Sequence, residues 1–335
     1  MSLIKKTQNI AFQNSLWKKG AKLVLGVSGG PDSVCMLDVM AKLAPKYDLK
    51  IIIAHVNYGL RGADSQKDEK FVRALADKYC VPAFFMKPDF KKKVSENALR
   101  DVRYEFFERL RTENKFDSIA VAHNADDQVE TFLMRVIRGA GLQGLSAMKY
   151  KSVYTFKSAK GGPAEREFNR GTIIRPLLAL TRLEILEHLK KQNLSYRTDK
   201  TNRRDLFLRN RIRNKLIPYL EKNFNPKIKK TIFDAAASIG EDYSLLQEVT
   251  DNSYMKNIKK GGLSAKKITG LHPALQRRIM LRLIYEKKKD SKDTEASHIE
   301  EIIKALKSTK SKNQIVTFKG LKVVRKGDRV TLDNF

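Results

Sequence analysis

One stretch decides the fold of this chain: Leu23-Val24-Leu25-Gly26-Val27-Ser28-Gly29-Gly30-Pro31-Asp32-Ser33. Its apolar first half predicts a buried strand, and Pro31 suits the first turn of a following helix. The glycines between them permit positive φ angles, so backbone N–H groups can converge on an anion. No Gly-Lys-Ser/Thr follows, which excludes a Walker loop, and Asp32 instead offers a carboxylate for Mg²⁺ on a triphosphate. The alternative is an ordinary strand-to-helix turn capped by Ser28 or Asp32.

The composition of the chain is strongly basic, with 67 Lys+Arg against 37 Asp+Glu and a net charge of +30 on 335 residues. This excess predicts a polyanionic partner, although a solvated, lysine-rich surface is the alternative. The length favours two domains. The two cysteines, Cys35 and Cys80, are too few for a disulfide framework or a four-cysteine zinc site. No leader and no apolar run of about 18 residues is evident, so we expect a cytoplasmic protein.

Short apolar runs alternate with helical periods through the first half of the chain. Strands are predicted over 22–27, 50–56, 83–86 and 118–122, and helices over 33–44, 65–80, 96–112 and 125–138. The alternation predicts an α/β domain over 1–222 with a parallel, doubly wound sheet. Over 223–335 the pattern predicts an appended, mainly helical C-terminal domain. Its helices are expected over 228–258, 272–288 and 295–307, and its short final strands over 314–318, 321–325 and 329–332.

Ligands of such sheets lie beyond the carboxyl ends of the strands, so the residues there are the candidates for a site. His55 and Asn57 end the second strand, where a structural role is an equal alternative, and Arg61 follows in a loop from which it could neutralise a phosphate. Arg100 and Arg103 share one flank of the third predicted helix. An arginine near bound ATP would stabilise charge on the α-phosphoryl group, while ion pairing with neighbouring acids is the alternative.

The fourth strand is followed by a polar cluster at the start of a helix. His123, Asp127 and Glu130 stand at i, i+4 and i+7 and therefore converge near the helix N-terminus. Two carboxylates and an imidazole suit a cationic ligand or Mg²⁺. Acidic residues in a first turn also complement the helix dipole, but that alternative does not account for His123 or Glu130.

Taken together, the motifs resemble the tRNA(Ile)-lysidine synthase family of the PP-loop ATP pyrophosphatase superfamily. The resemblance is dense from about residue 20 to 220 and implies the adenine nucleotide α-hydrolase-like fold. Two positions depart from the family pattern, because Tyr58 and Asn124 stand where histidine is usual. The matching motifs lie at 28–33, 55–61, 98–107, 122–131, 138–145, 174–178, 199–202 and 209–213.

The resemblance implies an AMP-forming, ATP-dependent C–N ligase. It would adenylate the wobble cytidine of an isoleucine tRNA with a CAU anticodon and attach free L-lysine at C2, giving lysidine, AMP and pyrophosphate. Codon recognition would change from AUG to AUA, and aminoacylation from methionine to isoleucine. The implied cofactors are ATP and Mg²⁺, the C-terminal domain would bind tRNA, and a homodimer is a hypothesis by analogy with related enzymes.

The same resemblance carries roles over to individual residues. Asp127 and Glu130 would hold the lysine cation, and His123 would orient or deprotonate the nucleophile. ATP would be bound by Ser28, Gly29, Gly30, Pro31, Asp32, Ser33, His55 and Arg61, with Asp32 as the Mg²⁺ ligand. The substrates would be bound by Arg100, Arg103, Asp127, Glu130 and Arg138, and the catalytic residues would be Asp32, Arg103, His123 and Asp127.

Two other functions compete with this hypothesis. A PP-loop tRNA thiolase would share the fold and the RNA, but it normally needs reactive cysteines or a metal cluster, which Cys35 and Cys80 do not match. A non-catalytic RNA-binding protein would leave the carboxylates of Asp32, Asp127 and Glu130 unexplained. The charged connection over 149–171 is either a flap over the anticodon loop or disordered.

Overall fold

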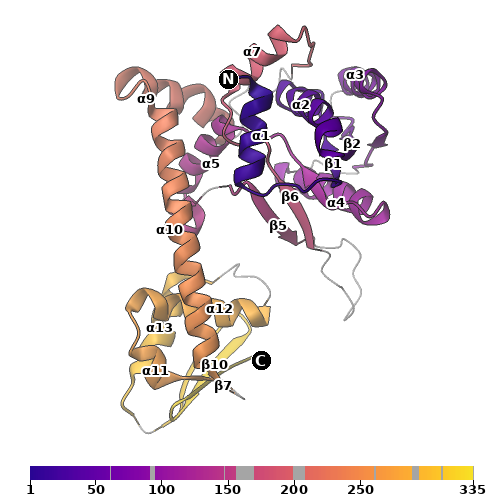
Figure 1. Cartoon of the computed structure of the whole chain (residues 1–335). Helices are drawn as coiled ribbons and strands as arrows, with labels where there is room; N and C mark the ends of the chain where they lie inside the picture. Colours follow the sequence, from indigo (N-terminus) through magenta and orange to yellow (C-terminus); the bar gives the residue numbers. More distant parts are fainter. Residues whose placement is uncertain are drawn as a thin grey trace. The chain divides into compact units, whose positions relative to one another are not determined.

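The computed structural model describes residues 1–60, 62–90, 95–146, 148–155, 170–198, 208–259, 262–288, 294–310 and 312–334. Contacts divide the chain into two compact units, Met1–Gly240 and Glu241–Phe335 (Figure 1). The division falls within helix α10 (Ile228–Asn257), whereas the sequence-based boundary at 222/223 falls near the end of helix α9 (Ile217–Asn223).

The first unit is built on a mostly parallel sheet, whose described part has the strand order β3-β2-β1-β4-β6-β5. All neighbouring strands are parallel except the edge pair β5 and β6, which is antiparallel. The α/β prediction is confirmed, with an antiparallel edge added where no strand was predicted. The strands are β1 (Lys22–Gly26), β2 (Lys50–Val56), β3 (Ala83–Met86), β4 (Ser118–Ala120), β5 (Lys151–Thr155) and β6 (Arg170–Ile174).

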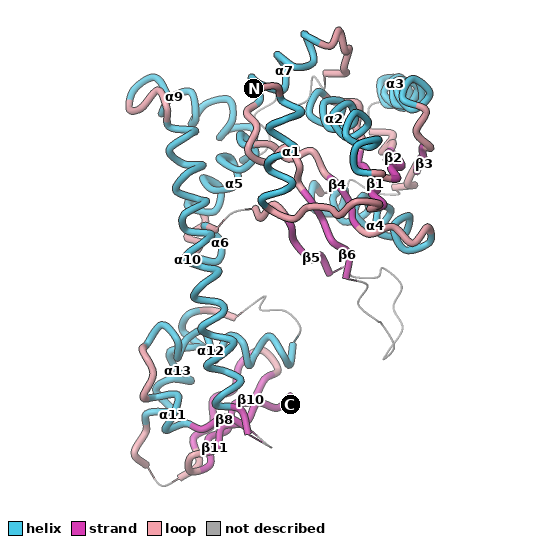
Figure 2. The backbone as a smooth tube through the Cα atoms, in the orientation of Figure 1, coloured by secondary structure: helices cyan, strands magenta, loops and turns pink. Residues whose placement is uncertain are grey.

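Helices cover both faces of this sheet, because its central strands are apolar on both sides (Figure 2). Leu23 and Leu25 of β1 point into the core that also contains residues of α1, α2 and α7. Val24, between them, points into the opposite core with Tyr104 and Phe107 of α4. The helices are α1 (Leu3–Gln13), α2 (Pro31–Tyr47), α3 (Ala63–Tyr79), α4 (Glu96–Glu113) and α7 (Arg182–Lys191).

Helix α5 (Ala125–Ile137) follows β4 and packs against a later helical segment of the same unit. Its buried Val129 shares a small core with Ile212, Ile217 and Ile232. This packing brings the basic segment around 209–213 next to the first turns of α5. The elements that contribute residues to this core, besides α5, are α8 (Leu208–Arg211), a π-helical turn (Ile212–Leu216), α9 and the start of α10. A short helix, α6 (Leu142–Leu145), follows α5 in the chain.

The second unit combines helices with an antiparallel sheet, whose described part has the order β7-β8-β11-β10-β9. Ile279, Ile302, Val323 and Val330 are among the residues of its core. The predicted helices and final strands are confirmed here. The elements are the rest of α10, β7 (Ile258–Lys259), β8 (Gly262–Ser264), α11 (Ala265–Thr269), α12 (Pro273–Lys288), α13 (Ala296–Lys307), β9 (Gln314–Phe318), β10 (Leu321–Lys326) and β11 (Arg329–Asn334).

Within the ranges that the structure describes, no helix combines the length and the apolar character needed to span a membrane.

Candidate active site

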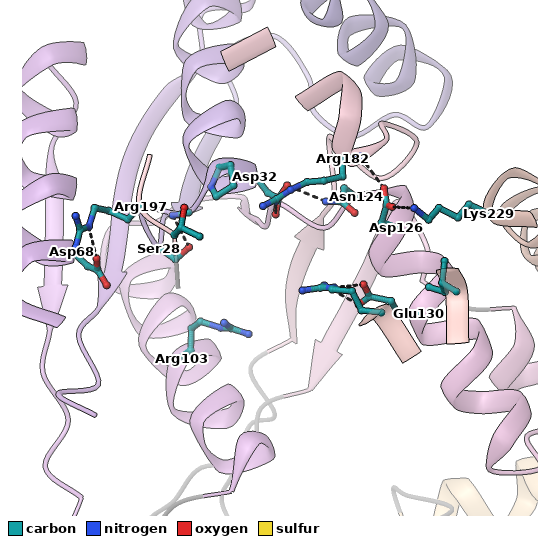
Figure 3. A pocket seen from close by; sticks show the side chains of 15 residues that line it. Ser28, Asp32, Asp68, Arg103, Asn124, Asp126, Glu130, Arg182, Arg197 and Lys229 are labelled. Carbon is teal, nitrogen blue, oxygen red and sulfur yellow. Dashed lines mark hydrogen bonds and ion pairs between the residues drawn. The ribbon is translucent and has the colours of Figure 1, made fainter. Parts of the chain in front are cut away.

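A cavity of about 550 Å³ lies where the chain leaves β1 and β4, at the carboxyl edge of the sheet (Figure 3). It is lined by Ser28, Gly30, Pro31 and Asp32 of the loop after β1, and by Asn124 at the start of α5. Both basic and acidic side chains line it. The basic ones are Arg103, Arg182, Arg197, Arg213 and Lys229, and the acidic ones are Asp32, Asp68, Asp126 and Glu130.

The loop after β1 has the conformation of an anion cradle. Gly29 adopts a φ of 85°, which a residue with a Cβ rarely adopts. Ser33 Oγ donates to the Gly30 carbonyl at 2.9 Å and accepts from the Ser28 N–H at 3.2 Å, which closes the loop. Gly30 caps helix α2 without a side-chain hydrogen bond, and Pro31 is the first helical residue. The N-terminus of α2 therefore presents backbone donors and a positive dipole end to the cavity.

Asn124 links the two loops that meet at the cavity. Its Nδ2 donates to Asp32 Oδ1 at 3.0 Å, while its Oδ1 accepts the Asp127 N–H at 3.0 Å and so caps helix α5. The second oxygen of Asp32 accepts a hydrogen bond from the Arg182 guanidinium. Among the described residues, no three His, Cys, Asp or Glu side chains could together hold a metal ion. Asp32 therefore fits Mg²⁺ only as one ligand beside phosphate oxygens and water, which is how proteins commonly bind it.

Asp127 and Glu130 lie together, and both are already paired with arginine. Arg209 donates from Nη2 to Asp127 Oδ1 and from Nε to Glu130 Oε2, both at 2.7 Å. Arg213 donates from Nε to Glu130 Oε1 at 2.5 Å and from Nη2 to Oε2 at 2.9 Å. Burial raises the pKa of Asp127 to about 6, although Arg209 opposes the shift. The two carboxylates predicted to hold a lysine cation thus face two arginines in this structure.

His123 has a different partner from the one that its spacing suggests. Arg175 Nε donates to its Nδ1 at 3.2 Å. Burial, reinforced by the charges of Arg175 and Arg209, holds the pKa of His123 well below its ordinary value. The ring is therefore neutral. Because a guanidinium stays protonated, Nδ1 is the acceptor and the ring proton resides on Nε2.

The other residues that were predicted to belong to the site have separate surroundings. His55 is buried and its Nδ1 bonds the Val27 carbonyl at 2.8 Å, a contact that fixes the ring inside the sheet. Arg100 lies over the Tyr104 ring, 5.1 Å from its centroid. Arg138 is exposed at the C-cap of α5. Three predictions fall outside the described residues, in whole or in large part: Arg61, the turn at 199–202 and the connection at 149–171, of which 156–169 are not described.

Several site residues had no role predicted from the sequence. Arg182, Arg197 and Lys229 line the cavity and pair with Asp32, Asp68 and Asp126, respectively. Arg175, Arg209 and Arg213 lie in the motifs at 174–178 and 209–213, which were the one available signal. No local sequence pattern distinguishes Arg182, Arg197 and Lys229 as site residues among the 67 Lys+Arg of the chain.

The chain is similar in sequence to known proteins of one family. A family model described as a PP-loop domain matches residues 2–220. Proteins named tRNA(Ile)-lysidine synthase are similar over nearly the whole chain. The one from Clostridium perfringens (strain ATCC 13124) is 35% identical over 320 residues, covering 93% of this chain and 64% of that protein. The one from Geobacillus kaustophilus (strain HTA426) is 32% identical over 338 residues, covering 98% and 70%.

The solved structure of the U34-tRNA thiolase NcsA from Methanococcus maripaludis with its [4Fe-4S] cluster shares the fold. Its TM-score is 0.55 at 19% identity, and the match covers 71% of this chain and 79% of that one. The chain spans less than two thirds of the length of its Clostridium perfringens relative.

Proposed function

Because this chain belongs to the tRNA(Ile)-lysidine synthase family of PP-loop proteins, we propose that it is an ATP-dependent ligase that attaches free L-lysine to tRNA. The proposed target is C2 of the wobble cytidine in an isoleucine tRNA with a CAU anticodon. The observation that carries the proposal is the cavity itself, which unites the Ser28–Ser33 loop, Arg103 and the polar start of α5.

The proposed reaction has two steps. In the first, the C2 carbonyl oxygen of cytidine attacks the α-phosphorus of ATP and pyrophosphate leaves. In the second, the ε-amine of lysine attacks C2, the C2–O bond breaks, and AMP leaves with the former carbonyl oxygen. The amine must shed its proton for this attack. A carbonyl oxygen is a poor leaving group until it is part of AMP, which is why ATP is consumed.

The loop and the basic residues of the cavity support the first step. Backbone N–H groups at the start of α2 would hold a phosphate, and Arg103 would stabilise the charge that develops on the α-phosphoryl group. Asp32 would hold Mg²⁺, which neutralises phosphate charge when bound. Arg182 pairs with the Asp32 carboxylate in this structure and lines the same cavity, so it could turn from Asp32 towards a bound phosphate.

The carboxylates of α5 support the second step. Asp127 and Glu130 would bind the lysine ammonium, sharing their oxygens with or releasing Arg209 and Arg213. Arg213 is the more exposed of the two arginines, at 42% against 26%, so it is the one that would be released. His123 has a proton on Nε2 and a low pKa, which suits it to orient the substrate by donating a hydrogen bond. The proposed substrates, ATP, lysine and tRNA, are cytoplasmic molecules, so we also propose a cytoplasmic location for the protein. That the protein forms a homodimer stays a prediction.

Incubation with ATP, Mg²⁺, labelled lysine and an unmodified isoleucine tRNA transcript tests this function, with elongator methionine tRNA as the control RNA. We expect label in the isoleucine tRNA alone. Asp32→Asn should lower the rate by about 100-fold or more, the usual effect of losing one electrostatic group from an active site. Asp64→Asn is the matched control, because Asp64 is 58% exposed and pairs only loosely with Lys67 at 3.7 Å. Absence of label from a protein that still binds ATP and the tRNA would refute the lysine assignment.

Two assays separate the competing functions. A thiolase would transfer labelled sulfur, and a cluster held by cysteines normally needs more thiolates than Cys35 and Cys80 provide. A non-catalytic RNA-binding protein would release no pyrophosphate from ATP in the presence of tRNA.

A further inference from the structure

Arginines of the first unit differ in whether a carboxylate pairs with them. Arg182, Arg197 and Arg209 each pair with a carboxylate. A second set of four arginines, on α4, on α5 and directly after β6 and here named the arginine quartet, has no carboxylate partner among the residues that the structure describes. It consists of Arg100, Arg103, Arg135 and Arg175.

Arg175 is the most buried member of the quartet, at 6% exposure. Its guanidinium donates to the Lys149 carbonyl at 2.7 Å, to Ser152 Oγ at 3.0 Å and to His123 Nδ1 at 3.2 Å. All three acceptors are neutral. A buried cation without a counter-charge is costly to the folded protein, so a bound anion would relieve an existing electrostatic penalty.

The other members approach Arg175 from helices α4 and α5. The guanidinium groups of Arg100 and Arg103 both lie near the Tyr104 ring, at 5.1 and 5.5 Å from its centroid. Arg135 donates to the Gly144 carbonyl at 2.5 Å, again a neutral acceptor. Burial lowers the pKa of Arg135 and of Arg175, and the charge of Arg100 contributes to both shifts, which shows that these cations lie within electrostatic reach of one another.

The quartet adjoins the cavity through Arg103. In Figure 3 this side chain projects into the cavity from α4, with no hydrogen bond or ion pair drawn to the other residues shown. The phosphates of ATP already have the loop at Ser28–Ser33 and the acid-paired arginines beside it. The quartet therefore offers additional positive charge at the edge of the nucleotide site.

We propose that Arg100, Arg135 and Arg175 of the arginine quartet bind phosphodiester groups of the substrate RNA next to the nucleotide that enters the cavity, while Arg103, which lines the cavity, serves the α-phosphoryl group of ATP. The proposal rests on the proposed function, because it takes the RNA to be the second polyanion at this site. Backbone phosphates of a single-stranded loop carry one charge each and are spaced along the chain, which matches several separate guanidinium groups better than one compact triphosphate does. Guanidinium groups also bind phosphate oxygens bidentately.

The test compares the RNA affinity of three charge-removing variants of the full chain. Arg100→Gln and Arg135→Gln each remove one quartet member. Because Arg100 is exposed, we expect its substitution to leave the fold intact. Arg109→Gln is the matched control: Arg109 lies on α4 as well, half a turn round the helix from Arg100, over the ring of Phe106. The probe is the unmodified isoleucine tRNA transcript, titrated at several salt concentrations, and ATP binding is measured separately without RNA.

We expect Arg100→Gln and Arg135→Gln to weaken RNA binding about 3- to 10-fold at ~0.1 M salt. The slope of log K against log salt should fall by about 0.7 to 1 for each variant, as for one lost phosphate contact. Arg109→Gln should leave the slope unchanged, and ATP affinity should be the same in all three variants. Weaker ATP binding with unaltered RNA binding would instead assign the quartet to the triphosphate and overturn the proposal. Unaltered binding of both ligands would overturn it as well.

These outcomes do not depend on lysine transfer. If the wild-type protein makes no lysidine, the proposed function fails while the binding comparison still decides whether the quartet contacts RNA phosphates. If lysidine forms but the salt slopes match those of the control, only the quartet proposal fails.

Discussion

Replacement of Glu130 by glutamine should destabilise the Met1–Gly240 unit by about 3 kcal/mol. The Glu130 side chain is only 1% exposed and accepts three hydrogen bonds from guanidinium groups. Glutamine has nearly the same shape but no charge. Its amide nitrogen, a donor, would also face a donor of Arg209 or Arg213, so at least one of these contacts becomes repulsive.

The size of this loss of stability depends on which interactions Arg209 and Arg213 retain in the variant. Removing one partner from a buried ion pair costs about 3–5 kcal/mol when the other charge stays buried and unpaired. Here Arg209 keeps its 2.7 Å contact with Asp127, and Arg213 is 42% exposed and can be hydrated. Both facts place the loss at the lower end of that range. In a unit of this size about 3 kcal/mol corresponds to a Tm lower by about 6–12 °C.

Urea unfolding followed by tryptophan fluorescence measures this loss, because the single tryptophan, Trp17, lies in the first unit and packs against its core. Because this fluorescence reports on the first unit alone, the unfolding of the second unit does not overlap with the measured transition. Asp234→Asn is the control, because its ion pair with Lys230 is exposed and should contribute less than about 0.5 kcal/mol. A Glu130→Gln variant no less stable than Asp234→Asn would refute the reasoning. So would a double-mutant cycle with Arg213→Gln that shows no coupling between the two positions.

Three further predictions concern protonation and the glycine loop. Burial raises the pKa of Asp127 to about 6, so protonation below that pH removes its charge. The KM for lysine should therefore rise up to about tenfold per pH unit below 6, and a flat profile from Asp127→Asn checks the assignment. Arg175→Met removes a cation that lowers the pKa of His123, so this pKa should rise in an NMR titration while that of His55 stays constant. Gly29→Ala forces a Cβ onto a residue with a φ of 85°, which should cost about 1–2 kcal/mol in urea unfolding and weaken ATP binding at least tenfold.

The elements that position the site could be predicted because each has a local signal. The run Leu23–Leu25 is apolar on both faces of a strand, and the periodic apolar residues of α4 and α5 mark their buried sides. The antiparallel pair β5 and β6 lacked such a signal. Strand β5 carries Lys151 and Ser152 beside Val153, which is 65% exposed, as expected for an edge strand that buries little apolar surface.

The partners of the site residues could not be predicted, because they come from distant parts of the chain. Arg182 reaches Asp32 across 150 positions and Arg209 reaches Asp127 across 82. Spacing along α5 brings Asp127 and Glu130 together, but it says nothing of which cation faces them. His123 shows the same limit: its spacing placed it with the carboxylates, and the arginine after β6 draws its ring into another hydrogen bond.

The pairing of charges in the cavity also has a consequence for how a triphosphate would enter. Each acid-paired arginine is already held in place by a carboxylate, so binding a phosphate exchanges one ion pair for another and orders few new side chains. After this exchange the carboxylate has lost its arginine and faces the negatively charged phosphates. Asp32 would be such a carboxylate once Arg182 turns away from it. A divalent cation held by Asp32 would offset that repulsion. Among the residues that the structure describes, the arginine quartet has no such carboxylate to release, so an anion that binds there should need no metal, as expected of a contact with an RNA backbone.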